Sequence, residues 1–283
     1  MTLLMGAVAY DPKVVTIWEG FRAWFAEHGL DFDFVLYSHY ERQVEDLVGG
    51  RLDAAWNSPL AWLRAQRLAQ TRGDRLTPLV MRDTDQDLTS VFVVRADSPY
   101  KDIADLKGAI IGVGAVDSPQ ATLIPLSHLR ASGLRPGEDV AIRRFDVGVG
   151  LHGDHIGGER DAAQALMAGG VEAACMVDAD HLLFTREGTL PPGGTRVIAT
   201  TRPFDHCNLS IGATLPPERA RTFGDLLLSM SYADPAVRRL FDLEGLTAWR
   251  PGRTSGYSAL DQAIDDDGFY SHSGQITAPG YRP

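Results

Sequence analysis

The densest cluster of ionisable side chains lies in the glycine-spaced segment His152–Asp161, which reads HGDHIGGERD. Two imidazoles three positions apart, with carboxylates between and after them, could act as acid and base near neutral pH or hold a metal ion. The alternative is a solvated loop in which Asp154 or Glu159 stabilises the start of a helix. We take His155 and Asp154 as the candidate catalytic residues of an enzyme and Arg160 as a candidate ligand-binding cation, and we predict no metal site.

A thiol and an imidazole are sequence neighbours in the segment 204–208, where His206 precedes Cys207. Neighbouring side chains on an extended strand point to opposite faces, so we expect no nucleophilic pair between these two residues. His155 could approach Cys207 across a cleft and make it a third catalytic candidate. The alternative is a buried cysteine that behaves as a small apolar residue, which we also expect of Cys175.

Arg82 opens the polar turn RDTDQD, and its guanidinium could clamp an anion through two parallel hydrogen bonds. The alternative is a solvated turn. Ligands of open α/β sheets bind beyond the carboxyl ends of the strands, which directs attention to the polar residues that follow each predicted strand. Asp161 and Asp178 are the candidates to accept hydrogen bonds from an amine of the ligand. The remaining ligand-binding candidates are Tyr10, Asp11, Asn57, Ser58, Ser118, Gln120, Thr122 and His206.

Strands that alternate with helices must position these residues. Apolar residues at helical spacing fill 14–28, and short apolar runs at 3–9 and 32–37 predict strands on either side. Such alternation is typical of a mostly parallel sheet. The pattern restarts after a β-branched run at 88–95 and is followed by a further β run at 195–200, so we interpret these two runs as the crossings of a hinge.

The predicted fold class is therefore α/β, with two lobes, a two-strand hinge and a cleft between the lobes. We expect the outer lobe to contain residues 1–92 and 198–283 and the inner lobe to contain residues 93–197. The tail from residue 271 is rich in Gly, Ser and Pro, and we expect it to be poorly ordered.

The composition excludes several classes of protein. Lys and Arg number 27 against 37 Asp and Glu, a formal net charge of −10, so we expect no nucleic-acid partner. No apolar stretch approaches the roughly 18 residues of a membrane span, and we expect no membrane insertion. Two cysteines in 283 residues are no disulfide scaffold. The Gly112–Gly114 segment lacks the third glycine of a dinucleotide fingerprint, and no cofactor is predicted.

The amino-terminal apolar run lacks a basic region ahead of it, and Asp11-Pro12 follows it in place of a small-residue cleavage site. We expect a cytoplasmic protein if the sequence is full length. If a leader has been removed, we expect a periplasmic or extracellular one.

Four blocks of sequence, in this order, resemble the phosphate/phosphonate solute-binding family of the type II periplasmic-binding-protein fold. They are DAAWNSPLAW at 53–62, SPQATLIP at 118–125 with SGL at 132–134, RDAAQA at 160–165 with EAA at 172–174 and Asp178, and Asp234-Pro235 with Tyr257. The resemblance covers roughly residues 3–265. It implies a small-molecule ligand held in a cleft between the lobes and, for an exported protein, the membrane component of an ABC transporter as partner.

The second block departs from the Ser-Thr-Ser-Gly helix start of that family, which binds an oxyanion at the positive end of a helix. Here Pro119 removes an N–H donor, Gln120 replaces a hydroxyl with an amide, and Ala121 replaces the glycine, although Thr122 adds a hydroxyl. A carboxylate or a mixed polar ligand suits this segment as well as a tetrahedral phosphonate does.

The expected function is therefore capture of a small anionic or zwitterionic solute, phosphonate-like or carboxylate, with hinge closure around it. The alternative is a cytoplasmic enzyme on the same fold, a decarboxylase, lyase or hydrolase, that uses His155 with neighbouring carboxylates or Cys207 in the cleft. The presence or absence of a leader in the full-length gene product would discriminate between the two functions.

Overall fold

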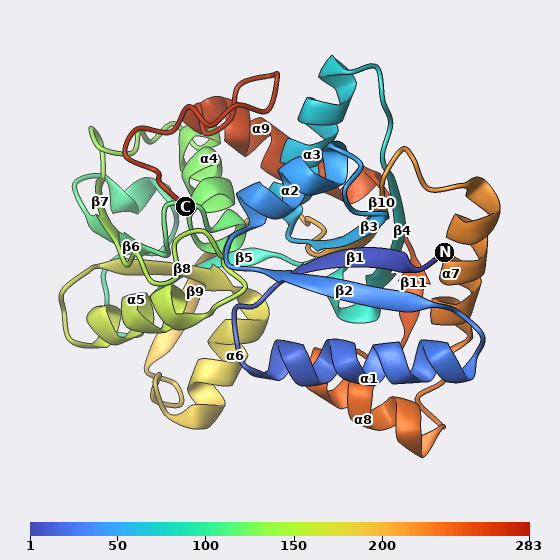
Figure 1. Ribbon diagram of the computed structural model, residues 1–283. Coiled ribbons are helices and arrows are strands. Elements are labelled where there is room, and N and C mark those ends of the chain that lie inside the picture. Colours follow the sequence, from blue (N-terminus) through green and yellow to red (C-terminus); the bar gives the residue numbers. More distant parts are fainter.

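Two separate β-sheets organise the chain in a computed structural model that describes residues 1–283 (Figure 1). The first sheet consists of β1 (Leu3–Val8), β2 (Phe32–Tyr37), β3 (Ala54–Asn57), β4 (Thr77–Arg82), β10 (Asn208–Ile211) and β11 (Trp249–Pro251). Its strand order is β11-β4-β10-β3-β1-β2. β1 pairs in parallel with both β2 and β3, whereas β10 runs antiparallel between β3 and β4.

Six helices cover the first sheet, three on each face. One face packs against α1 (Lys13–Glu27), α7 (Pro217–Ser229) and α8 (Pro235–Glu244). The other packs against α2 (Tyr40–Val48), α3 (Pro59–Thr71) and α9 (Ser258–Asp267). The apolar spacing that predicts the first helix is the stripe that α1 buries, with Trp18, Phe21 and Phe25 at its centre.

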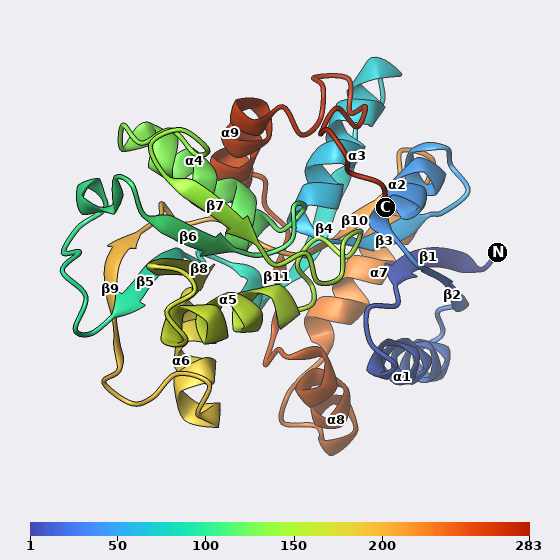
Figure 2. The same ribbon diagram turned by 90° about the vertical axis from the view of Figure 1, so that its left-hand side faces the viewer.

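The second sheet consists of β5 (Ser90–Arg95), β6 (Ile110–Val113), β7 (Ala141–Arg144), β8 (Ala173–Val177) and β9 (Thr195–Thr200), in the order β7-β6-β8-β5-β9. Figure 2 shows it between α4 (Ile124–Ala131) on one face and α5 (Gly157–Met167) and α6 (Asp178–Glu187) on the other. β6 pairs in parallel with β7 and β8, and β5 runs antiparallel between β8 and β9. The predicted two-lobed α/β fold class is confirmed.

The chain crosses between the two sheets twice. The two β-rich runs that predict the hinge, β5 and β9, both lie within the second sheet, and the crossings are the segments just before β5 and just after β9. There Leu88 and Phe204 form an isolated antiparallel bridge, with backbone hydrogen bonds of 2.8 Å in both directions. The predicted lobe boundaries, at 92/93 and 197/198, stay a prediction.

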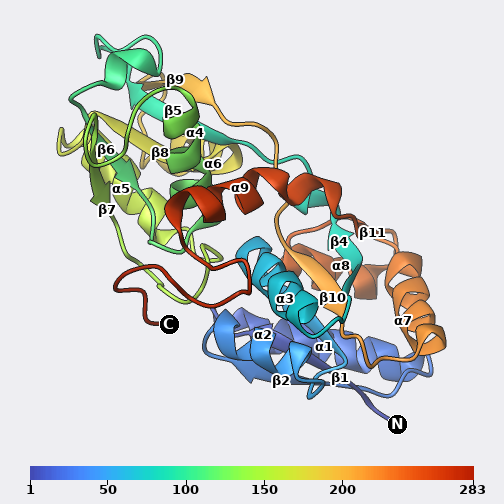
Figure 3. The ribbon, with the colours of Figure 1, turned by 90° about the horizontal axis from the view of Figure 1, so that it is seen from above.

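α9 and the C-terminal tail also connect the lobes, as Figure 3 shows from above. Ser127 and Arg130 on α4 donate hydrogen bonds to the carboxylates of Asp266 and Asp267 at the end of α9. The tail then passes over α2 and buries Tyr281, of which 1% is exposed. The expectation of a poorly ordered tail is wrong, because Ala278 and Tyr281 are buried in the core that α2, α3 and α9 form. No helix is both long and apolar enough to cross a membrane.

Candidate ligand-binding site

A cavity of about 230 Å³ lies between the lobes, at the carboxyl ends of strands from both sheets. We call it the interlobe cavity. The first lobe contributes Tyr10, Trp56, Arg82, Asp85, His206 and Cys207 to its lining. The second lobe contributes Gln120, Gly153, Asp154, Val177, Ala179 and Asp180. Sheet topology explains the convergence, because strand ends of the same direction meet at one edge of a sheet.

Arg82 ends β4 on the floor of the cavity and is not part of a solvated turn. Its Nε and Nη2 donate to the two carboxylate oxygens of Asp85 at 2.5 and 2.9 Å, and its Nη1 donates to the backbone oxygen of Glu244 at 2.8 Å. Its guanidinium carbon also lies 5.2 Å from the ring centroid of Trp56. Burial opposes the charge of Arg82, but the Asp85 carboxylate raises the pKa of this guanidinium well above its usual value. Arg82 is therefore a paired cation rather than a free anion clamp.

The two carboxyl groups that pair with Arg82 differ in acidity. Burial opposes ionisation of Asp85, but the Arg82 charge outweighs it and lowers the pKa of Asp85 to about 2. Burial of Glu244, whose Oε1 lies 3.3 Å from Arg82 Nη1, exceeds the effect of the same cation and raises the pKa of Glu244 to about 7. Asp85 is thus the permanent anion of this pair.

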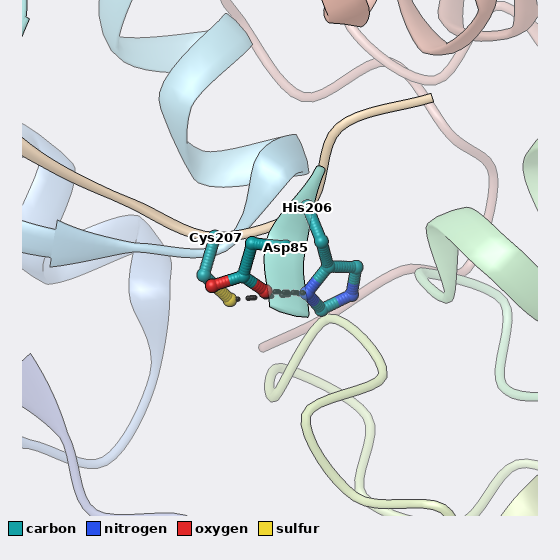
Figure 4. A group of neighbouring side chains, drawn as sticks. All are labelled: Asp85, His206 and Cys207. Carbon is teal, nitrogen blue, oxygen red and sulfur yellow. Dashed lines mark hydrogen bonds and ion pairs between the residues drawn. The ribbon is translucent and has the colours of Figure 1, made fainter. Parts of the chain in front are cut away.

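Asp85, His206 and Cys207 point toward one another in the cavity wall (Figure 4). His206 Nδ1 lies 3.1 Å from Cys207 Sγ and 3.5 Å from Asp85 Oδ1. The two side chains do not point to opposite faces as the expectation of an extended strand required, because β10 begins only at Asn208 and both residues occupy the irregular backbone before it. The absence of a nucleophilic pair stays a prediction. Burial, followed by the nearby Asp154 and Asp85 charges, raises the pKa of Cys207 well above its usual value, so its thiol stays protonated.

Asp154 reaches these residues from the second lobe. Cys207 Sγ donates to its Oδ1 at 3.5 Å, and the hydroxyl of Tyr40 donates to its Oδ2 in a short contact. Burial raises the pKa of Asp154 to about 6, against the opposing effects of His206 and Cys207. Asp154, and not His155, is the residue that meets Cys207 across the cleft.

Gln120 forms part of the opposite wall with two acidic neighbours. Its amide nitrogen donates to the Gly153 carbonyl at 2.8 Å and to Glu159 Oε1 at 3.0 Å, while its carbonyl oxygen has no partner although only 4% of the residue is exposed. Burial raises the pKa of Glu159, and the charge of Asp180 raises it further. Burial likewise raises the pKa of Asp180. The raised pKa values favour a protonated carboxyl group between Glu159 and Asp180, so this wall offers acceptor oxygens with less than two full negative charges.

A second interlobe contact adjoins the cavity, and we call its residues the His152 cluster: Glu41, Ser58, Asp117, His152 and Tyr281. The imidazole of His152 is fully buried. Its Nδ1 lies 2.7 Å from the Ser58 hydroxyl oxygen and its Nε2 lies 2.8 Å from Glu41 Oε1. Burial opposes ionisation of Glu41, but the His152 charge and hydrogen bonds lower its pKa to about 2.

The remaining members of the His152 cluster hold the loop that carries His152. Asp117 Oδ2 accepts the backbone N–H groups of Gly150 and His152 at 2.6 and 3.2 Å. The Tyr281 hydroxyl donates to Glu41 Oε1 at 2.6 Å. Loop, tail and both lobes therefore share one hydrogen-bonded network.

Several of the predicted ligand-binding residues serve local structure. Ser58 caps α3 by accepting the Ala61 N–H at 3.1 Å, with Pro59 in the first turn as predicted. Asn57 donates to the Ser210 hydroxyl at 2.6 Å within the first sheet. Ser118 accepts the Ala121 N–H at 3.2 Å. Thr122 is fully buried, and neither it nor the other three lines the cavity.

Five further candidates lie outside the cavity. The Asp11 carboxylate accepts the Lys13 N–H at the start of α1, and the Asp178 carboxylate accepts the Ala179 N–H at the start of α6. Arg160 pairs with Glu187 at 2.8 Å. His155 is exposed, and its Nδ1 accepts the Gly157 N–H where α5 begins. Asp161 is half-buried on α5.

Tyr10, Arg82, Gln120, Asp154, His206 and Cys207 are the sequence candidates that the structure brings together around the cavity. Sequence reasoning missed Asp85 and Asp180. The three-residue spacing from Arg82 to Asp85 and the position of Asp180 after a predicted strand were the available signals. Sequence reasoning also chose His155 over His152 as the functional histidine. Nothing in the sequence distinguishes the buried imidazole from the exposed one.

The charge balance of the lining is negative. Asp85 offsets the charge of the single lining arginine, Arg82, so the carboxyl groups of Asp154 and Asp180 remain without a cationic partner in the lining. The donor set that could hold a metal ion is Asp85, His206 and Cys207, whose ligand atoms all lie within 4.8 Å of one another.

Comparisons with known proteins relate the chain to binding proteins. A family model described as phosphonate ABC transporter, periplasmic substrate-binding protein, matches residues 6–257. The comparison with curated proteins finds no significant match. Nothing in these comparisons supports the enzyme alternative.

Solved structures share the fold at low sequence identity. PhnD1 of Prochlorococcus marinus in complex with methylphosphonate has a TM-score of 0.69 and 13% identity, covering 94% of this chain and 97% of that one. A Xanthomonas citri protein bound to ATP has a TM-score of 0.70 and 17% identity, covering 93% and 98%. The periplasmic aliphatic sulphonate binding protein SsuA of Escherichia coli has a TM-score of 0.59 and 18% identity, covering 94% and 90%.

These likenesses confirm the type II periplasmic-binding-protein fold, with its two α/β lobes. A shared fold does not by itself show family membership. The family model does, because it matches the sequence itself over nearly the whole chain. The chain belongs to the phosphonate ABC transporter family of periplasmic substrate-binding proteins, whose function is solute binding.

Proposed function

We propose that the chain captures in its interlobe cavity a small zwitterionic solute, one that carries an ammonium group as well as an acidic group, and presents it to the membrane component of an ABC transporter. The observation that carries this proposal is the cavity of about 230 Å³, lined from both lobes at the strand ends. Its volume lies below the roughly 300–1,000 Å³ of sites for drug-sized ligands, which favours a small solute. The family supports the transporter as partner.

The charge of the lining supports an ammonium group on the solute. Three carboxylates surround the cavity, and its one guanidinium is already paired, so a bare dianion would meet more repulsion than attraction. The carbonyl oxygen of Gln120 has no partner, and Asp180 lines the same cavity. An ammonium group can donate three hydrogen bonds to acceptors of these two kinds.

Calorimetric titration with matched pairs of solutes tests this proposal. We would compare 2-aminoethylphosphonate with ethylphosphonate, and β-alanine with propionate, so that each pair differs in the amine alone. We expect the aminated member to bind at least tenfold more tightly, because a charge-assisted hydrogen bond is worth about 1.5–3 kcal/mol.

Two variants locate the amine. Asp180→Asn should remove most of the preference for the aminated member, whereas Asp161→Asn, on the neighbouring helix α5 and outside the cavity, should leave it unchanged. Equal affinity for both members of each pair, or an equal effect of the two variants, would contradict the proposed solute class. Absence of binding across phosphonates, carboxylates and amino acids by a folded protein would contradict capture itself.

A further inference from the structure

We propose that Asp85, His206 and Cys207 from the first lobe, with Asp154 from the second, bind a divalent transition-metal ion of the zinc class in the interlobe cavity. The inference deepens the proposed function and rests on it for the role of the cavity.

The donor types select the metal. A thiolate, an imidazole and carboxylates are the ligands of Zn²⁺ and of the transition metals that resemble it, whereas Mg²⁺ and Ca²⁺ take oxygen ligands. Cys207 and His206 supply the sulfur and nitrogen, and Asp85 and Asp154 supply one oxygen each. Each residue type is a known ligand of tetrahedral zinc.

The three first-lobe donors have separations close to the edges of a tetrahedron. Bonds of about 2.0–2.3 Å to zinc place the ligand atoms roughly 3.3–3.8 Å apart. The observed separations are 3.1 Å from His206 Nδ1 to Cys207 Sγ and 3.5 Å from His206 Nδ1 to Asp85 Oδ1, and all three ligand atoms lie within 4.8 Å of one another. Asp154 Oδ1 lies 3.5 Å from Cys207 Sγ but outside this group of three, so a movement of the Asp154 side chain would complete the coordination.

The surroundings hold the donors in place. Asp85 and Cys207 are 2% and 1% exposed. The backbone N–H of His206 donates to the Asp85 carbonyl at 2.8 Å, which fixes these two residues relative to each other. Arg82 orients the Asp85 carboxylate through two hydrogen bonds, and each carboxylate oxygen keeps a second lone pair for a metal.

The positive charge of Arg82 opposes a cation at this position. The ionised Asp85 carboxylate offsets that charge through two hydrogen bonds, and the carboxyl group of Glu244 lies 3.3 Å from the same guanidinium. Zn²⁺ binding with release of the Cys207 thiol proton would add one net positive charge to the cavity, which offsets the carboxylate of Asp154 and leaves Asp180 for the amine of a solute. The added charge would reduce the repulsion between the lining and the acidic group of that solute.

Zinc titration of the chelator-treated full chain tests the inference, with calorimetry for affinity and Co²⁺ substitution for ligand identity. We expect one Zn²⁺ per chain and, with Co²⁺, a thiolate-to-cobalt charge-transfer band in the near ultraviolet. Cys207→Ser and His206→Asn should each weaken zinc binding at least about 100-fold, since losing a group that merely orients a ligand already costs about 10- to 100-fold. Cys207→Ser should also abolish the band.

Matched controls use the other residues of the same types. Cys175→Ala and His155→Asn should bind zinc as the wild type does, because both residues lie outside the cavity. Asp154→Asn should weaken zinc binding about tenfold and identifies the donor from the second lobe. Circular dichroism checks that every variant is folded.

Zinc affinity that is equal in the wild type, Cys207→Ser and His206→Asn would overturn the inference, as would a folded wild type without a cobalt–thiolate band. Solute titrations with and without zinc separate this inference from the proposed function. If solutes bind but zinc does not, the metal site alone is wrong. If zinc binds as described and no solute of the panel binds in either state, the proposed solute capture alone is wrong.

Discussion

The interlobe cavity and the His152 cluster both join the two lobes, and they treat polar groups in opposite ways. In the His152 cluster an imidazole, a hydroxyl, two carboxylates and a phenol bond to one another or to the loop backbone, although one oxygen of each carboxylate, Glu41 Oε2 and Asp117 Oδ1, has no partner. In the cavity three carboxylates and one arginine line open volume that a solute can occupy. Polar groups that bond across the lobes stabilise the closed arrangement, whereas groups that face open volume are available to a solute.

The largest effect is expected from breaking the His152 cluster. His152→Ala removes the imidazole that offsets the buried charge of Glu41, which keeps only the hydroxyl donors of Tyr270 and Tyr281, and should lower the free energy of unfolding by about 3–5 kcal/mol. Urea denaturation followed by circular dichroism measures this loss. His155→Ala, three positions along the same loop but exposed, should stay within about 0.5 kcal/mol of the wild type. Equal stability of the two variants would show that the His152 cluster contributes nothing.

Two carboxyls at the cavity, Asp154 and Glu244, should change stability with pH in the direction opposite to Glu41 of the His152 cluster. Burial raises the pKa of Asp154 to about 6 and of Glu244 to about 7. At pH values between about 4 and 7 these two carboxyl groups therefore bind more protons in the folded state than in the unfolded state. The free energy of unfolding should therefore rise as the pH falls from 7 to about 4.5, by up to about 1.4 kcal/mol per pH unit for each carboxyl. Glu244→Gln should flatten this rise.

Glu41 produces the opposite slope at lower pH. Its pKa is lowered from 4.5 to about 2 in the folded protein, so the stability it contributes is present above about pH 4.5 and is lost as the pH falls toward 2. Denaturant titrations at pH values from 3 to 8 should show a stability maximum near pH 4.5. A curve that falls steadily from pH 7 to 3 would contradict the raised pKa values of the cavity carboxyls.

A smaller effect is expected from the tail. Tyr281→Phe removes the hydroxyl that donates to Glu41 and should lower the free energy of unfolding by about 2 kcal/mol, the contribution of a hydrogen bond to a charged group. Arg282→Ala, at the exposed neighbouring position, is the control. If the two variants have equal stability, the tail covers the cluster without bonding to it.

The smallest effect should have the opposite sign. Asp180→Asn relieves the repulsion between Asp180 and Glu159 and should raise the free energy of unfolding by about 1 kcal/mol. The same variant should lose the preference for an aminated solute, so stability and binding would change in opposite directions. A variant that is both less stable and unchanged in binding would place Asp180 in the structural region rather than in the binding site.

Sequence patterning by itself determined the architecture. The helical spacing of Trp18 and Phe21, the Ser58-Pro59 helix start and the interruption of the strand–helix alternation each depend on residues close together in the chain. Local patterns report local structure faithfully because backbone geometry imposes their periods. The strand ends then placed Tyr10 and Gln120 at the cleft without further information.

Tertiary structure alone decided which polar residues meet. His152 and His155 stand three positions apart in one glycine-spaced loop, yet one is buried between the lobes and the other is exposed. Asp154 meets Cys207, and Tyr281 meets Glu41, across separations of 53 and 240 residues. No local pattern encodes such contacts, because they depend on how two lobes and a tail pack together. The composition of the cavity therefore follows from the packing of the lobes, while its location follows from the order of strands and helices.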